Sequence, residues 1–302
     1  MKRLITITLM AGTAFLATAC GPTKSGTLGS APTGTPRTGT ASPTSQATGQ
    51  ATGVASPSPG KPIEASATIT IETWFTRDQK IFLTHRTRPA TVATSRLALT
   101  ELIAGPSGLE SAAGVGNAIP LDTTFTVTVS GGVATVSLPG WFYDASRARA
   151  RLRQAQVVYT LTQFPTVSRV GFQKDGQATA APVGRADYAD LLPRIIVTKP
   201  AIGQRLTSPI TVAGIASTYE STVYLRLLDA AGKQIATTYT TAHCLPRCPF
   251  EFSTHHGNFS TTVAYRLSSE QPATLQVSGE SADGSNTGPV ANIPVLLAAS
   301  GS

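Results

Sequence analysis

The residues with the clearest chemical potential are two cysteines and three histidines that lie close together late in the chain. Cys244 and Cys248 are separated by three residues, and His243, His255 and His256 fall within the same 14 positions. Thiolate and imidazole groups are zinc ligands, but a C-x3-C spacing followed by adjacent histidines matches no common zinc-finger pattern. Two cysteines at this spacing can instead close a small loop as a disulfide, or act as a redox pair. Which chemistry applies depends on whether the chain is exported.

A second cluster consists of four arginines at every second position: Arg147, Arg149, Arg151 and Arg153. On the helix expected there, position 147 aligns with 151 and position 149 with 153, in two stripes about 200° apart. We expect these stripes to form solvated helix flanks. The alternative is a binding site for an anion or an acidic partner, and the Trp141-Phe142-Tyr143 cluster upstream would then add aromatic contact.

No arrangement of residues predicts an active site. The chain has no G-x-S-x-G motif. His85 is the only histidine before position 243. Acidic residues up to Asp144 occur singly, without a spacing that forces two of them into one site. We therefore predict a protein that is not an enzyme and that has no cofactor and no metal.

The N-terminus predicts where the protein is located. Residues 1–20, MKRLITITLMAGTAFLATAC, combine a basic start, an apolar stretch and small residues before Cys20. This order resembles a bacterial lipoprotein signal, although the family pattern prefers Leu where Ala17 stands. The apolar run of about 16 residues is shorter than the roughly 20 needed to cross a bilayer. We predict a signal peptide over 1–19 and lipid on Cys20, which would hold the protein on the outer face of the cytoplasmic membrane.

Export favours one of the alternatives for the late cysteines. With Cys20 lipidated, Cys244 and Cys248 are the two thiols that remain, and they would lie in an oxidising compartment. We predict that they form a disulfide rather than a zinc site or a catalytic redox pair.

The residues after Cys20 predict a flexible linker over 20–66. From Gly21 to Gly60, 34 of 40 residues are Thr, Ser, Gly, Pro or Ala, which cannot bury enough apolar area to offset chain entropy. The formal charge of +8 becomes +6 when Lys2 and Arg3 are removed with the signal peptide. This mild basic excess suits a surface near anionic lipids or wall polymers, with ordinary solubility as the alternative explanation. Nucleic acid is not an expected partner outside the cell.

The next region predicts an α+β domain over 67–182. Alternating residues from Ala67 and from Lys80 indicate one hairpin, and FTVTV and VATVSL, separated by Ser130-Gly131-Gly132, indicate another. Helices are expected from about Thr94 to Ala104 and from about Ser146 to Phe164, followed by a strand, VSRVGFQ. We expect one antiparallel sheet with two helices packed on one side.

Four segments of this region are similar to a known domain. They are Gly105-Pro106, AIP at 118–120, GGVATVSL at 131–138 and QVVYTLTQFPTVSRVGF at 156–172. Together they resemble the GerMN domain of sporulation and spore germination proteins, and the last segment is specific. The resemblance implies a scaffold rather than a reaction. We expect Val157, Val158, Leu161 and Phe164 to be core contacts of the second helix.

The C-terminal region, 193–298, predicts an all-β sandwich of eight short strands separated by turns such as Ala230-Ala231-Gly232. Residues 199–232 and 281–285 resemble the immunoglobulin-like domain that accompanies GerMN in spore germination lipoproteins.

These features favour a noncatalytic lipoprotein that acts as a scaffold or accessory protein for other envelope proteins. The resemblance implies a role in sporulation or germination, although GerMN domains also occur in bacteria that form no spores. The alternative is a binding module for an anionic wall polymer or a small ligand.

Overall fold

In this computed structural model we describe residues 67–243, 256–280 and 288–300. The strands are β1 (Thr68–Arg77), β2 (Lys80–Pro89), β3 (Thr126–Ser130), β4 (Val133–Leu138), β5 (Arg169–Lys174), β6 (Gln177–Ala178), β7 (Ile195–Lys199), β8 (Arg205–Leu206), β9 (Ile210–Ala216), β10 (Thr222–Asp229), β11 (Gln234–Thr241), β12 (Gly257–Val263), β13 (Gln271–Ser278) and β14 (Val290–Leu297). The helices are α1 (Thr94–Ala104), α2 (Gly108–Ala112) and α3 (Arg147–Leu161), with short 3-10 helices η1 (Gly140–Phe142), η2 (Arg185–Leu191) and η3 (Tyr219–Ser221). Among the described helices, none combines the length and apolar composition that a membrane span requires.

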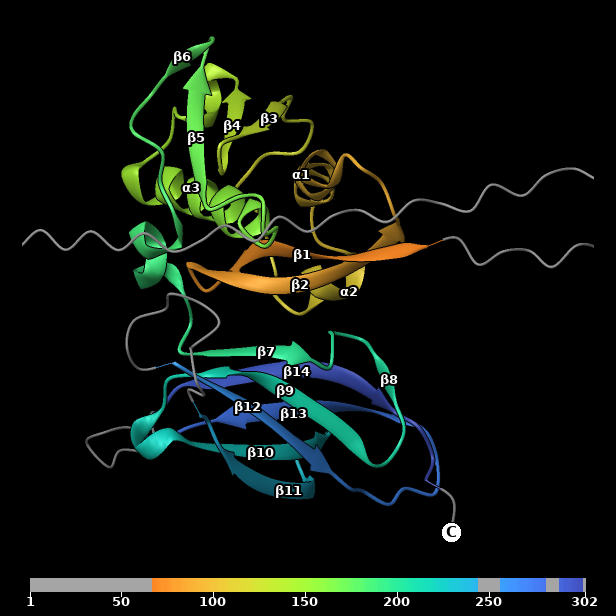
Figure 1. Cartoon of the computed structure of the whole chain (residues 1–302). Coiled ribbons are helices and arrows are strands. Elements are labelled where there is room, and N and C mark those ends of the chain that lie inside the picture. Colours follow the sequence, from red (N-terminus) through yellow and green to blue (C-terminus); the bar gives the residue numbers. More distant parts are fainter. Residues whose placement is uncertain (1–66, 244–255, 281–287, 301–302) are drawn as a thin grey trace, which may run out of the picture. The chain divides into compact units, whose positions relative to one another are not determined.

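The α+β class of the first domain is confirmed, but its layers differ from the expected single sheet. β1 and β2 form a two-stranded sheet, and β3 to β6 form a separate four-stranded sheet in the order β3-β4-β5-β6. Helices α1 and α3 lie between these two sheets (Figure 1). The reason is visible in α3, whose residues from Ala155 to Leu161 are all buried. A helix buried on every side needs a covering layer on both faces.

Both predicted hairpins are present. Their two-residue turns, Asp78-Gln79 and Gly131-Gly132, have positive φ at both positions, the geometry that matches the twist of paired strands. The expectation of an antiparallel sheet is wrong at one point, because β4 and β5 are parallel. Parallel neighbours need a crossover connection, and α3 provides it.

The helix ends follow local capping chemistry. Ser146 caps α3 by accepting a hydrogen bond from the backbone N–H of Arg149. Helix α1 starts after Ala93 without a side-chain cap. The short helix α2 was not predicted, although Ser107 and Glu110 form a reciprocal capping box, a pattern that the sequence displays.

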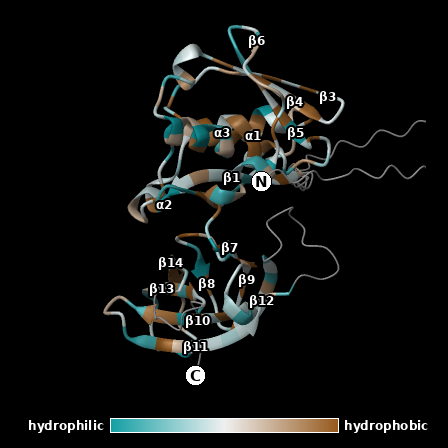
Figure 2. Ribbon diagram, turned by 90° about the vertical axis from the view of Figure 1, so that its left-hand side faces the viewer, coloured by the Kyte–Doolittle hydropathy of each residue, from teal (hydrophilic) through white to brown (hydrophobic). Residues whose placement is uncertain are grey.

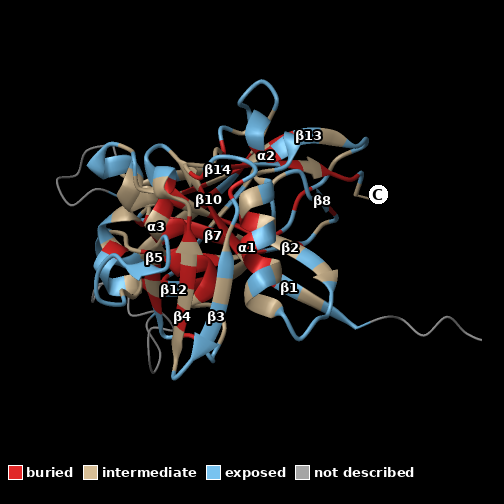
Figure 3. Cartoon of the chain, turned by 90° about the horizontal axis from the view of Figure 1, so that it is seen from above, coloured by how far each residue is buried: buried red, intermediate tan, exposed pale blue. Residues whose placement is uncertain are grey.

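The core of the first domain gathers around α3. Val157, Val158 and Leu161 are buried as predicted, and Phe164 is half-buried against the same cluster. Trp74 of β1 is fully buried beside them. Hydrophobic residues collect where α1, α3 and β5 come together (Figure 2), and buried residues concentrate on the same elements (Figure 3).

The second domain is the predicted all-β sandwich. One sheet has five strands in the order β11-β10-β13-β14-β8, and the other has three in the order β12-β9-β7. Their inner faces share an aliphatic core that includes Val212, Leu225, Leu227 and Leu275. The two-residue strand β8 was not predicted. The strand expected at 248–254 lies outside the described residues, as do the signal peptide and the linker.

Candidate functional site

The outer edge of β1 is covered by polar side chains of helix α3 and of the turn that follows it. The Gln163 carboxamide accepts from the backbone N–H of Glu72 and donates to its C=O, both at 2.8 Å. Thr160 Oγ1 accepts from the N–H of Trp74 at 3.2 Å, and Gln156 Nε2 donates to the C=O of Trp74 at 2.9 Å. Gln156 and Thr160 are four residues apart and share one face of α3, and Gln163 follows in the turn just after the helix. Their amide and hydroxyl groups take the place of a neighbouring strand.

The cover continues beyond the helix. Thr76 exchanges two backbone hydrogen bonds with Gly116, at 2.8 and 2.7 Å. Gln156 also accepts from the N–H of Ala118 at 3.1 Å and donates to Asn117 Oδ1 at 2.9 Å, so both ends of its buried amide are satisfied. The backbone edge of β1 is therefore closed from position 72 to position 76.

Arg185, from η2, lies against the rings of Tyr159 and Trp74 next to this edge. Its guanidinium carbon lies 5.0 Å from the centroid of Tyr159 and 6.0 Å from that of Trp74. Nε donates to Thr162 Oγ1 at 2.8 Å, and Nη2 lies 3.8 Å from Glu72 Oε2. Burial lowers the pKa of Arg185, and the Glu72 carboxylate opposes this shift. The guanidinium thus fastens the segment after β6 to the end of α3.

A cavity of about 650 Å³ opens beside Arg185. Its charged groups interact with their own surroundings: Asp187 accepts from the N–H of Gly184 at 2.7 Å, and Glu72 faces both Arg185 and Trp74 Nε1. Its described lining contains neither histidine nor cysteine. Both carboxylates of the lining interact with local donors, so the arrangement supports the local fold.

Two further arginines join β2 to the helices of the first domain. Arg86 forms a bidentate pair with Glu110, and Arg88 forms one with Glu101 at 2.7 Å for both bonds. Burial alone would raise the pKa of Glu110, but the hydrogen bonds from Arg86 and Ser107 outweigh it and lower that pKa. Paired arginine and carboxylate groups explain why these charges are tolerated near the core.

The structure divides the four predicted arginines of α3 into three environments. Arg153 is 6% exposed, and it donates to the backbone oxygens of Ala118, Trp141 and Phe142 at 2.7 to 3.1 Å. The expectation of a solvated flank is therefore wrong for Arg153, because its guanidinium satisfies otherwise buried carbonyl groups. Arg151 pairs with Asp190 at 2.8 Å, and the hydrogen bonds from Arg151 lower the pKa of this exposed carboxyl.

The first two arginines of α3 are exposed. Arg147 and Arg149 lie in the first turn after Ser146, and the exposed fraction of Trp141 nearby is 43%. Of the aromatic cluster, Phe142 is buried and Tyr143 is half-buried. Binding of an anion or partner by this surface stays a prediction, now confined to Arg147 and Arg149.

Comparison with known families separates the chain into the same two regions. A model described as Germane, sporulation and spore germination, matches residues 67–180, and a model described as Gmad2, immunoglobulin-like domain of bacterial spore germination, matches residues 194–285. The chain carries a GerMN domain followed by an immunoglobulin-like domain of the spore germination type. No curated protein matches it.

Several solved structures have detectable likeness to the chain. The tandem GerMN domains of the sporulation protein GerM from Bacillus subtilis are 13% identical, with 78% of this chain and 62% of that chain covered and a TM-score of 0.34. The first GerMN domain of the same protein is 21% identical over 38% of this chain and 90% of that one, with a TM-score of 0.30. A putative lipoprotein from Clostridium perfringens is 16% identical over 45% and 98%, with a TM-score of 0.28. These scores are too low to support an argument about this chain.

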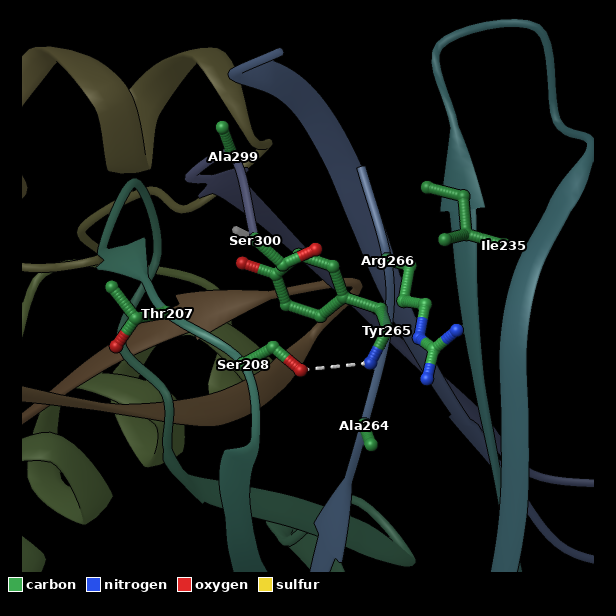
Figure 4. Close-up of a pocket in the computed structure, with 8 residues that line it drawn as sticks. All are labelled: Thr207, Ser208, Ile235, Ala264, Tyr265, Arg266, Ala299 and Ser300. Carbon is green, nitrogen blue, oxygen red and sulfur yellow. Dashed lines mark hydrogen bonds between the residues drawn. The ribbon is translucent and has the colours of Figure 1, made fainter. Parts of the chain in front are cut away.

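A cavity of about 760 Å³ in the immunoglobulin-like domain also surrounds structural hydrogen bonds (Figure 4). The Tyr265 hydroxyl donates to the backbone oxygens of Leu206 or Ala298, at 2.8 and 3.0 Å, and its N–H donates to Ser208 Oγ at 2.9 Å. Ser300 Oγ accepts from the N–H of Leu267 at 2.7 Å. These bonds tie the segment after β12 to the β8–β9 turn and to the residues that follow β14.

The remaining predicted site residues are outside the described part of the chain. Cys20 precedes it, and Cys244 and Cys248 fall in its internal gap, so the lipid, disulfide and zinc predictions stay predictions. Within the described ranges, no three histidine, cysteine, aspartate or glutamate side chains gather in a metal-binding group. Sequence reasoning missed Gln156, Thr160 and Gln163, although their spacing of four and three residues, next to the apolar residues at 155–161, was the available signal.

Proposed function

We propose that this protein is a noncatalytic lipoprotein, anchored through Cys20 on the outer face of the cytoplasmic membrane, that serves other envelope proteins as an accessory or scaffold. One observation carries the proposal: both domain types are associated with sporulation and spore germination, and they follow each other directly in this chain. Buried polar groups of the first domain form structural hydrogen bonds, which is consistent with a noncatalytic role. Gln156, Thr160, Arg153 and Arg185 are all engaged in holding the GerMN domain together.

The anchor part of the proposal rests on the signal sequence. Lipid chains contribute about 0.8 kcal/mol per buried methylene, so two or three acyl chains retain a protein at the bilayer. The test is labelling of cells with a palmitate analogue, comparing the wild type with Cys20→Ala. We expect label and membrane retention in the wild type and loss of both in the variant. Equal labelling of the two forms would contradict the anchor.

The partner part of the proposal needs a separate experiment. Cross-linking in native cells, followed by affinity capture, should recover a dominant envelope protein with the wild type and not with Cys20→Ala. If the organism forms spores, deletion of the gene should also delay sporulation or germination. Turnover of a wall-derived substrate by the pure protein would overturn the noncatalytic assignment.

The second candidate function is binding of an anionic envelope polymer. The exposed Arg147 and Arg149 next to the partly exposed Trp141 favour it. The double variant Arg147→Ala/Arg149→Ala should lose salt-sensitive binding to isolated cell walls. Arg226→Ala/Arg266→Ala is the matched control, because it removes two exposed arginines from the immunoglobulin-like domain. An equal loss in both variants would indicate a net-charge effect without a site.

A further inference from the structure

The outer edge of β3 in the GerMN domain is open in the described part of the chain. β3 is the first strand of the β3-β4-β5-β6 sheet, and β4 is its one partner among the described strands. The two-residue Gly131-Gly132 turn makes Ser130 and Val133 a hydrogen-bonded pair. Because backbone groups alternate in direction along a strand, the N–H and C=O groups of Val127 and Val129 point away from β4. These groups face the side on which none of the described strands is paired.

This edge lacks the features that normally prevent strand addition. Its sequence, TVTVS, contains no charge and no proline, and its pairing with β4 has no bulge. Other described edges are protected. β2 carries a lysine, two arginines and a proline, the β10–β11 and β7–β9 pairings contain register shifts, β6 and β8 have two residues each, and β12 is joined on its outer side by the His243–Asn258 bridge.

The strand is also complementary to itself. In an antiparallel pairing centred on Thr128, position 127 faces 129 of the second strand and position 126 faces 130, so valine meets valine and hydroxyl side chains meet hydroxyl side chains. Val127 and Val129 are the residues whose backbone groups point outward, so this register forms two reciprocal pairs of hydrogen bonds. A two-fold axis through Thr128 relates the two pairs of hydrogen bonds, because each copy contributes the same strand edge.

Charge favours a second copy as the occupant. The chain has a formal charge of +8, so most of its surfaces would repel themselves, yet positions 123–143 contain no charged residue and no histidine. β3, its turn and β4 all lie in this stretch. Two copies can therefore approach through β3 without bringing like charges directly opposite each other.

We propose that two copies of this protein associate through antiparallel pairing of their β3 strands about Thr128, forming a continuous sheet across a two-fold axis. A shallow cavity next to the edge, lined by Val92, Arg96, Val127 and Val129, would be partly covered by the second copy. Val92, which is fully exposed, is the apolar residue with most to gain from that cover. This association goes beyond the accessory role and does not depend on it.

Cysteine cross-linking of the full chain in native membranes tests the pairing. At a non-hydrogen-bonded antiparallel pair, the two Cβ atoms lie about 4.5 to 5.5 Å apart, so Thr128→Cys should form a dimer on mild oxidation. Thr135→Cys is the matched control, since Thr135 lies directly opposite Thr128 on the next strand but away from the edge. We expect dimer from Thr128→Cys and little from Thr135→Cys.

Equal cross-linking at the two positions, or none at either, would overturn the proposal. A cross-linked product of Thr128→Cys with the mass of a different protein would also overturn it, and would assign the edge to a foreign strand.

A charge variant provides an independent measurement. Thr128→Lys places two ammonium groups at the proposed axis, whereas Thr135→Lys adds the same charge on the same face, one strand away. In sedimentation of the detergent-purified full chain, we expect Thr128→Lys to weaken self-association by about tenfold or more. Thr135→Lys should leave it unchanged. A monomeric wild type at every concentration, or equal weakening in both variants, would contradict pairing through β3.

Discussion

The two hairpins of the GerMN domain treat their outer edges in opposite ways. The β1–β2 hairpin has ten residues in each strand. The edge of β1 is closed by Gln156 and Thr160 of α3, by Gln163 just after the helix and by Gly116. The β3–β4 hairpin is shorter, and the edge of β3 has no such cover among the described residues.

The comparison shows how a helix can replace a strand. Polar residues at fully buried helix positions would cost free energy if they were unpaired, and here each of them finds a backbone group that would otherwise lack a partner. The backbone groups of the covered edge are therefore bonded within the domain and cannot pair with another strand. The open edge keeps its backbone groups available for another chain.

The variant that should disturb the covered edge most is Gln156→Leu. Leucine keeps the approximate volume but removes the side-chain partner of Trp74 C=O and of Ala118 N–H, and one of the hydrogen bonds of Asn117. We expect the free energy of unfolding to fall by about 3 kcal/mol. Urea unfolding followed by tryptophan fluorescence measures it selectively, because both tryptophans, Trp74 and Trp141, belong to the GerMN domain.

Gln177→Leu is the control for this substitution, since Gln177 is exposed in β6 of the same domain. It should leave the transition unchanged. A loss of less than about 1 kcal/mol for Gln156→Leu would show that water replaces the amide and that the edge is not closed by side chains.

The second effect concerns pH and the attachment of β2. Because the pKa of Glu110 is lowered in the folded protein, its pairing with Arg86 contributes stability that is fully present above its ordinary pKa of 4.5 and is lost as pH falls through the lower folded value. Glu110→Gln should cost about 2 kcal/mol near pH 7 and much less near pH 3. Urea unfolding at the two pH values measures this difference. Asp144→Asn, at an exposed carboxyl of the same domain, should show no such convergence.

A milder change at the covered edge is Thr160→Val. The substitution keeps the shape of the side chain and removes the acceptor for the N–H of Trp74, while the C=O of Trp74 keeps its bond from Gln156. We expect a loss of about 1 to 2 kcal/mol in urea unfolding. Thr166→Val, at an exposed position, should have no effect. A neutral Thr160→Val would indicate that Trp74 N–H needs no partner there.

The hairpins, the two long helices and the sandwich could be predicted because their periodicity and turn residues are local. The two-layer cover of α3 could not be predicted from a helix pattern alone, because the polar residues Gln156 and Thr160 are buried through hydrogen bonds to the edge of β1. The parallel β4–β5 pair is a tertiary outcome of the crossover. Arg153 was misjudged because alternate spacing was taken as exposure, whereas a long guanidinium can reach buried carbonyl groups.

The smallest effects should come from the two turns, and they should have opposite signs. Gln79 has a φ of +57°, a conformation that costs a residue with a side chain about 1 kcal/mol, so Gln79→Gly should stabilise the β1–β2 hairpin by up to about that amount. Gly132 has a φ of +80°, and a Cβ there would lie 3.2 Å from Ser168 Oγ. Gly132→Ala should therefore destabilise the domain by about 1 kcal/mol in the same urea assay. A shift of the urea midpoint in the same direction for both substitutions would contradict this account. Backbone strain at positive φ would then not be what decides the stability of the two turns.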